Sequence, residues 1–171
     1  DRMLFSDGPM GIEKYYLYAD FLSDDISSAD FKTLNGKRIG VLIGAKPEAM
    51  LNEWELKNGL KTIHINIKSK EEALAKLENG EIDCFISLEE PSWADKDVSI
   101  ITRIGKSNIY FAINKDHPEI KKELDLVMHQ LEEERPFYMS DLYRQYFSSD
   151  YTPVLSSEEK SWLEEHGAIR M

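Results

Sequence analysis

Residues 35–67 read NGKRIGVLIGAKPEAMLNEWELKNGLKTIHINI, and the start of this stretch decides the fold. Residues 38–43 (RIGVLI) are a largely apolar run between turn residues, which predicts a buried strand that ends at Gly44. A helix is expected over residues 47–57, because it starts with a proline, which suits the first turn of a helix, and stops at an Asn-Gly pair. A buried strand followed so closely by a helix is typical of an α/β protein.

The next elements repeat this alternation of strand and helix. Residues 62–67 (TIHINI) alternate strictly, which predicts a half-buried strand with its isoleucines inward and His64 outward. Ser69 and Glu72 form a capping box that opens a helix, and residues 82–88 (IDCFISL) form the following strand. The order strand-helix-strand-helix-strand predicts a parallel sheet.

Further elements extend the sheet and add helices. A strand is expected at residues 14–19, and a β-hairpin at residues 98–104 and 108–114, with Gly105-Lys106-Ser107 as its turn. Helices are expected at residues 118–133, 140–147 and 157–166. The predicted fold class is therefore α/β, with a central mixed, mostly parallel sheet flanked by helices.

The 171-residue chain carries 32 acidic and 21 basic residues, a net charge of −11. Residues 1–31 hold seven acids and two bases (−5), and residues 116–171 hold thirteen acids and six bases (−7), so the middle is nearly neutral. An acidic chain repels phosphate backbones, and we therefore expect no nucleic-acid partner. The sequence has no apolar run near the ~20 residues of a membrane helix, and its 42% of hydrophobic residues suffice for a packed core.

Residue patterns that would carry catalysis or bind metals are absent from the sequence. No pair among the four histidines has the spacing of a helical zinc site, and none is beside Cys84. Cys84 lies in an apolar strand, which favours a packed thiol over a nucleophile. Residues 40–46 are similar to a phosphate loop, but Pro47 stands where Ser or Thr would hold magnesium. We therefore expect no catalytic residue, no metal and no cofactor.

Candidate ligand contacts lie where the predicted strands end, since ligands of open α/β sheets bind at the carboxyl ends of strands. The turn at Gly44 and Ala45 would offer backbone N–H groups to an anion, although a tight turn without a ligand fits the same residues. Trp93 is a candidate stacking platform or a packed side chain. Polar or cationic parts of a ligand would meet the residues at the end of strand 82–88, which are Ser87, Leu88, Glu89 and Glu90.

Four segments occur in an order and spacing that identify a family resemblance. They are Phe5-Ser6-Asp7 with Pro9, residues 34–41 (LNGKRIGV) with Gly44, residues 73–83 (ALAKLENGEID), and residues 110–115 (YFAINK) with Pro118. Together they resemble the bacterial extracellular solute-binding proteins of family 3, which have the type 2 periplasmic-binding fold and serve polar amino acids. The resemblance implies a clamshell of two lobes, in which Ser6 lines the hinge side.

The chain departs from that family at two places. Leu88 stands where amino-acid binders have an aspartate for the ammonium of the ligand, and Glu89 and Glu90 follow it. The arginine that clamps a ligand carboxylate in the family would fall before Asp1, so Arg2 is not its equivalent. These departures argue against a standard α-amino acid as the ligand.

The tail resembles the linker between tandem solute-binding modules of membrane-bound bacterial sensors. A capping box at Ser156 and Glu159 opens its helix, and Ile169-Arg170 resembles the start of a following module. A C-terminal helix that simply covers the domain is the alternative. The resemblance implies an extracytoplasmic module, membrane-anchored in the full-length protein, whose closure on a solute biases an output domain such as a histidine kinase or a diguanylate cyclase.

The resemblance also implies a domain plan and partners. Residues 1–33 would be a hinge strand with a partial first-lobe segment, residues 34–114 the second lobe, residues 115–150 the return helices and residues 151–171 a linker helix. The expected partners are a small polar solute, a neighbouring solute-binding module of the same polypeptide, and a second copy of the full-length receptor. A module that binds no ligand and acts only as a rigid spacer between the membrane and the neighbouring module is an alternative.

Two other functions fit the same resemblance. One is a stand-alone ABC-transporter binding protein for amino acids or other small polar solutes. The other is a dehydratase-like enzyme on the same fold, for which only Glu89 and Glu90 are candidate general acids or bases.

Overall fold

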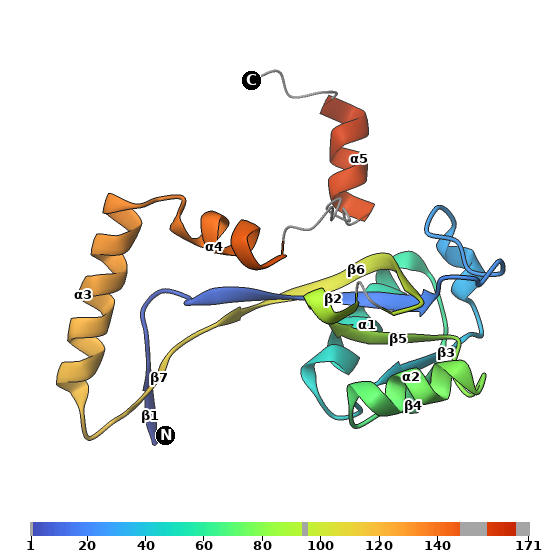
Figure 1. Ribbon diagram of the computed structural model, residues 1–171, viewed down its shortest axis with the longest axis horizontal. Helices are drawn as coiled ribbons and strands as arrows, with labels where there is room; N and C mark the ends of the chain where they lie inside the picture. The colour runs from blue at the N-terminus through green and yellow to red at the C-terminus, as the bar shows by residue number, and fades with distance from the viewer. Residues whose placement is uncertain (1, 94–95, 148–156, 167–171) are drawn as a thin grey trace. The chain divides into compact units, whose positions relative to one another are not determined.

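The computed structural model describes residues 2–93, 96–147 and 157–166 (Figure 1). The chain divides into two compact units, of which unit 1 comprises Asp1–Glu13 and Lys106–Tyr151, and unit 2 comprises Lys14–Gly105 and Thr152–Met171. Two strands, β2 (Gly11–Asp20) and β6 (Val98–Ile109), each begin in one unit and end in the other. The units are therefore joined by strands that are neighbours in one sheet.

Unit 2 is built on a sheet of order β4-β3-β5-β2-β6. Its central strands are β3 (Arg38–Val41), β4 (Ile63–Asn66) and β5 (Cys84–Leu88). β3 runs parallel to β4 and to β5, whereas β2 runs antiparallel to β5 with Leu17 opposite Ile86. The predicted fold class, an α/β fold with a mixed sheet, is confirmed: the strands that alternate with helices are parallel, since each helix returns the chain to the same end of the sheet.

The helices that flank this sheet are α1 (Lys46–Asn58) and α2 (Lys70–Glu78). α1 has Pro47 in its first turn and ends at Gly59, whose φ of 63° is the left-handed cap that favours glycine. At the start of α2 the Ser69 hydroxyl accepts the Glu72 N–H at 3.2 Å, which confirms the capping interaction predicted for this serine. Local signals therefore define both helices.

The core of unit 2 lies on both faces of the sheet, because successive side chains of β2 point to opposite sides. Leu17 packs in the cluster that contains Trp54 of α1. Tyr18 packs on the other face with Phe85, their ring centroids 5.4 Å apart, in the cluster that contains Ala73 of α2. The sheet is thus the middle of three layers in this unit (Figure 1).

One sequence prediction for unit 2 is wrong, and another is only partly confirmed. Gly105 does not form a hairpin turn but lies within the continuous strand β6, where a Cβ would stand 2.9 Å from Sδ of Met50, so a larger residue here would require the Met50 side chain to move. Of the isoleucines predicted to point inward, Ile67 is 7% accessible and Ile65 packs against the same core cluster, whereas Ile63 is 52% accessible. His64 points to the carboxylates of α1. β4 is an edge strand, so one of its sides lacks a neighbouring strand.

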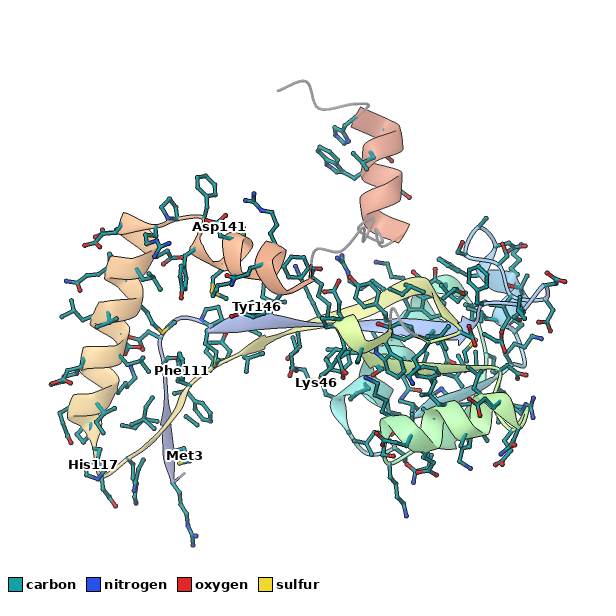
Figure 2. The ribbon with its side chains drawn as sticks, in the orientation of Figure 1. Met3, Lys46, Phe111, His117, Asp141 and Tyr146 are labelled. Atoms are coloured by element: carbon teal, nitrogen blue, oxygen red, sulfur yellow. The ribbon has the colours of Figure 1, made fainter. Side chains whose placement is uncertain are left out.

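Unit 1 consists of a two-stranded sheet and two helices. β1 (Met3–Phe5) pairs antiparallel with β7 (Ala112–Asn114), and the helices are α3 (Pro118–Glu134) and α4 (Tyr138–Phe147). Lys121 of α3 holds the start of the chain, since its ammonium lies 2.6 Å from Asp7 and 2.5 Å from Asp125. Figure 2 labels Met3 on β1 and His117 just before α3. Both helices occupy the positions predicted from sequence.

The remaining elements are short. They are the 3₁₀ turns at Phe31–Leu34 and Pro91–Trp93 and the helix α5 (Ser157–His166). In α5 the rings of Trp162 and His166 stack, with their centroids 4.4 Å apart. The capping serine expected at position 156 and the Ile169-Arg170 pair lie outside the described residues. Among the helices that are described, none combines the length and apolar character needed to cross a bilayer.

Candidate ligand-binding site

A pocket of about 230 Å³ opens in unit 2 where the parallel strands end. Leu42 and Ile67, which follow β3 and β4, form part of its wall, together with Ser87 on β5. The first turns of α1 and α2 complete the pocket, which thus lies at the carboxyl edge of the sheet, where ligands of open α/β folds bind. Of the predicted ligand contacts, Ser87 and Glu90 line this pocket, whereas Gly44, Ala45, Leu88 and Glu89 lie outside its lining.

The backbone donors of the α1 turn are already hydrogen-bonded within the chain. The Gly44 N–H donates to Oε2 of Glu48 at 2.7 Å, and the Ala45 N–H donates to the Leu42 carbonyl at 3.3 Å. Ala45 is the N-cap of α1 but has no side-chain hydroxyl to offer, and Pro47 lacks an N–H. An anion that bound this turn would have to displace the Glu48 carboxylate.

The end of β5 is held by two aromatic side chains. The Leu88 carbonyl accepts hydrogen bonds from the Tyr18 hydroxyl at 3.2 Å and from the Trp93 indole N–H at 3.1 Å. Trp93 is only 3% exposed and packs against Tyr18 and Phe85. Since burial and hydrogen bonding both fix the ring, its packing role is confirmed, and the residue also lines the pocket.

Glu89 is paired inside unit 2. Its carboxylate lies 3.2 Å from Nζ of Lys14 and 3.5 Å from the Tyr16 hydroxyl, and its side chain is 11% exposed. A ligand ammonium would have to compete with Lys14 for this carboxylate. The sequence indicated the carboxylate but not its partner, because the two residues are far apart along the chain.

Glu90 is also paired, and its partner was missed by the sequence analysis. Oε2 of Glu90 accepts from Nζ of Lys70 at 2.6 Å and from the Ser92 hydroxyl at 3.0 Å. The hydrogen bond from the Lys70 ammonium is the main reason why the pKa of Glu90 lies below its ordinary value. Burial opposes this shift, and the hydrogen bond from the Ser92 hydroxyl adds to it. Lys70 also lies over the Trp93 ring, 4.1 Å from its centroid.

Ser6 belongs to unit 1, whereas the pocket is lined by residues of unit 2. The residue is buried. Its hydroxyl donates a hydrogen bond to the Gly8 carbonyl at 2.8 Å and accepts one from the Phe111 N–H at 3.2 Å. These bonds extend the pairing of β1 with β7, so in this structure Ser6 has a structural role within its own unit.

The groups that could support other chemistry are engaged elsewhere. Burial raises the pKa of Cys84 to about 12, which confirms a packed thiol. The nitrogens of His64 lie 3.7 Å from the Glu48 carboxylate and 3.2 Å from the Glu55 carboxylate, and its side chain is 17% exposed, so its predicted surface position is only partly confirmed. Within the part of the chain that is described, no group of three or more His, Cys, Asp or Glu residues could hold a metal ion.

The fold is that of the type 2 periplasmic-binding proteins, and its solved structural neighbours include proteins described as probable or putative amino-acid ABC transporter proteins. The probable amino-acid ABC transporter extracellular-binding protein YtmK of Bacillus subtilis superposes with a TM-score of 0.70 at 16% identity, covering 88% of this chain and 66% of that one. A putative L-cystine ABC transporter protein of Listeria monocytogenes gives 0.60 at 18% identity, with coverages of 89% and 66%.

A third neighbour is an ancestral amino-acid-binding protein, AncCDT-1, described as a precursor of cyclohexadienyl dehydratase. It gives a TM-score of 0.59 at 22% identity and covers 86% of this chain and 62% of its own. The chain thus spans less than two thirds of the length of these proteins. No protein-family model and no curated protein sequence matches the chain.

Proposed function

We propose that this chain is the larger part of a solute-binding module that captures a small polar solute outside the cytoplasm and reports its binding by closing. In the finer form of the proposal, the module belongs to a membrane-anchored signalling protein with a histidine kinase or diguanylate cyclase output. Residues 34–114 would form the second lobe, residues 115–150 the return helices, and residues 151–171 the linker to a following module.

The observation that carries this proposal is the pocket at the carboxyl edge of the unit 2 sheet, combined with β2 and β6 as connections between units. A solute that binds one unit tightly and the other only on closure shifts the population towards the closed state. Adjacent strands are suited to this movement, because small dihedral changes spread along two strands can rotate one unit. Ser87, which lines the pocket, would contact the solute.

The transport and sensing alternatives share this mechanism and differ in what the polypeptide contains after Met171. A second solute-binding module and a membrane helix would support the sensor, whereas a stop codon at that point would contradict it and favour the ABC-transporter protein. The neighbours are named as binding proteins, which supports binding over catalysis. The lowered pKa of Glu90 further disfavours this residue as a general acid near neutral pH.

Solute binding is tested by thermal unfolding of the complete polypeptide with a panel of amino acids, amines and carboxylates. A ligand at ten times its Kd is expected to stabilise the module by about 1.4 kcal/mol. Ser87→Leu should abolish the shift by filling the pocket, while Ser28→Leu, on an exposed loop, should retain it. A shift that survives Ser87→Leu would contradict binding in this pocket, and no shift with any solute would favour the rigid spacer.

Unit 1 has the properties of an incomplete first lobe. Of its described residues only Ser6, Ser107 and Ile113 are buried. Met3 and Phe5 project from the same side of β1, and Phe5 is 58% exposed. A two-stranded sheet is marginally stable by itself. We therefore propose that a further segment of the same polypeptide extends this sheet and covers the exposed face of β1.

Amide hydrogen exchange tests this proposal. Amides of β1 and β7 should exchange at least tenfold more slowly in the complete polypeptide than in the 171-residue chain, because added strands and core protect them. Amides of β3 and β5 serve as the control and should exchange equally in both. Equal exchange of β1 would contradict the proposal, as would protection in the 171-residue chain that rises with protein concentration, since that would identify a second copy as the cover.

A further inference from the structure

The pocket of unit 2 holds a cation that belongs to the chain itself. The Lys70 ammonium contacts three different groups: the Glu90 carboxylate at 2.6 Å, the Ser92 hydroxyl, and the face of the Trp93 ring, whose centroid is 4.1 Å from Nζ. Both Lys70 and Glu90 line the pocket. The Lys70 side chain is 24% exposed and the Glu90 side chain is 41% exposed, so the ion pair is still partly accessible to water.

These three groups are suited to binding a primary ammonium ion. The carboxylate provides a charge-assisted hydrogen bond, the hydroxyl oxygen accepts a second one, and the indole face attracts a cation more strongly than other aromatic rings do. The arrangement resembles the way in which proteins recognise amine ligands, except that the amine here is the end of a lysine side chain.

The Trp93 ring is fixed by burial, whereas the lysine is held only at its end. The Trp93 ring is 3% exposed, donates its N–H to the Leu88 carbonyl and packs at 5.1 Å from Phe85. The Ser92 hydroxyl donates to Glu90 at 3.0 Å and so orients the carboxylate. Lys70 reaches these groups through four methylene groups with several rotatable bonds, and neither the Ser92–Glu90 hydrogen bond nor the packing of Trp93 depends on it.

The position of Lys70 along α2 shows that the helix does not explain the contact. Lys70 is the first residue of α2, where the helix dipole favours negative charge, and Glu71 and Glu72 follow it in the first turn. A lysine there is electrostatically unfavourable for the helix. The stabilisation of its ammonium therefore comes from Glu90, Ser92 and Trp93.

We propose that Glu90, Ser92 and Trp93 form a primary-ammonium subsite of the pocket, and that Lys70 occupies this subsite as an internal competitor of amine ligands. An alkylammonium group enters when the Lys70 side chain moves into solvent. Solutes that carry an amine therefore bind more weakly than they would to the same subsite without Lys70 in it. The proposal concerns the ligand class of the pocket and rests on the proposed solute-binding function only for the use of the subsite by a natural solute.

The test measures binding of n-butylammonium chloride to the complete polypeptide. Lys70→Ala should bind this amine at least tenfold more tightly than the wild type, and at ten times its Kd the amine should raise the Tm of the variant by about 3 °C. The indole N–H resonance of Trp93 in two-dimensional NMR spectra should shift in the same titration. Lys76→Ala is the matched control, because Lys76 of the same helix pairs with Glu81 at 3.0 Å without an aromatic partner.

Further variants separate the possible outcomes. Lys70→Ala/Glu90→Gln should lose the gain in amine binding, and Lys70→Ser replaces Lys70→Ala if the latter does not fold. Equal amine affinity of wild type and both Lys70 variants would overturn the proposal. Binding of butyrate that is lost in Lys70→Ala would overturn it too, since Lys70 would then be an anion ligand. Because no natural solute is needed, this result is independent of the solute panel that tests the proposed function.

Discussion

Gly40→Val is expected to lower the free energy of unfolding of unit 2 by about 3 kcal/mol or more, which is a large part of the 5–15 kcal/mol of a typical domain. A Cβ at this position of β3 would stand 2.8 Å from Cδ1 of Ile82, 3.1 Å from Cγ2 of Ile67 and 3.2 Å from Cβ of Phe85. The first two atoms can move with their side chains, but Cβ of Phe85 is fixed to the backbone of the neighbouring strand. Valine adds two methyl groups to this overlap.

The same substitution should also change the shape of the pocket, because Ile67 and Phe85 line it. Unfolding in urea, followed by tryptophan fluorescence, reports on this unit through Trp54 and Trp93. Gly8→Ala is the control: it has no heavy atom within 4 Å of the added Cβ, and its unfolding midpoint should stay unchanged. A Gly40→Val protein with the midpoint of the wild type would show that the packing around β3 is looser than the structure indicates.

The helices could be predicted from sequence because their boundaries depend on neighbouring residues. Pro47 and Gly59 delimit α1, and the Ser69 cap starts α2 wherever the helix packs. A glycine within an apolar segment is more ambiguous, since it marks either a turn or a close approach. At Gly105 the close approach of Met50 from α1 was the reason, and no local pattern contains that information.

The candidate site was predicted in its position but not in its electrostatics. The carboxyl ends of the parallel strands follow from the order of strands and helices, and the pocket lies there, with Ser87 and Glu90 in its lining. The ionic partners come from other elements: Lys14 lies on β2 and Lys70 on α2. Whether a carboxylate is available to a ligand depends on such tertiary contacts, which charge counts along the sequence do not reveal.

The connection between β3 and β5 also depends on one ionic group at the opposite end of the strands. The Asp83 carboxylate accepts the backbone N–H of Arg38 at 2.7 Å, as well as Nε at 3.1 Å and Nη2 at 2.7 Å of the same residue. Arg38 in turn donates from Nη1 to the Gly80 carbonyl at 2.7 Å, which holds the turn after α2. This bidentate pair therefore joins the start of two parallel strands to the preceding turn.

Asp83→Asn is expected to lower the free energy of unfolding at pH 7 by about 2 kcal/mol, which is within the range for one hydrogen bond to a charged group. We expect no more than this, although three bonds are affected, because the carboxylate is 23% exposed and water screens the pair. The amide keeps one acceptor but turns its NH₂ towards a donor. Glu81→Gln, which affects the more exposed ion pair with Lys76, is the control and should leave the unfolding midpoint nearly unchanged.

The pH dependence of the stability shows whether the charge of the Asp83 carboxylate, rather than the shape of the side chain, stabilises the fold. The hydrogen bonds from the Arg38 side chain hold the pKa of Asp83 below its ordinary value of 3.8. A carboxyl whose pKa is depressed in the folded state stabilises that state above its unfolded pKa, and the contribution disappears as the pH falls through the folded pKa. The stability difference between wild type and Asp83→Asn should therefore be constant above about pH 5 and shrink below about pH 4, in urea titrations at each pH. A difference of equal size at pH 3 and pH 7 would mean that the ionised form of Asp83 does not hold β3 and β5 together.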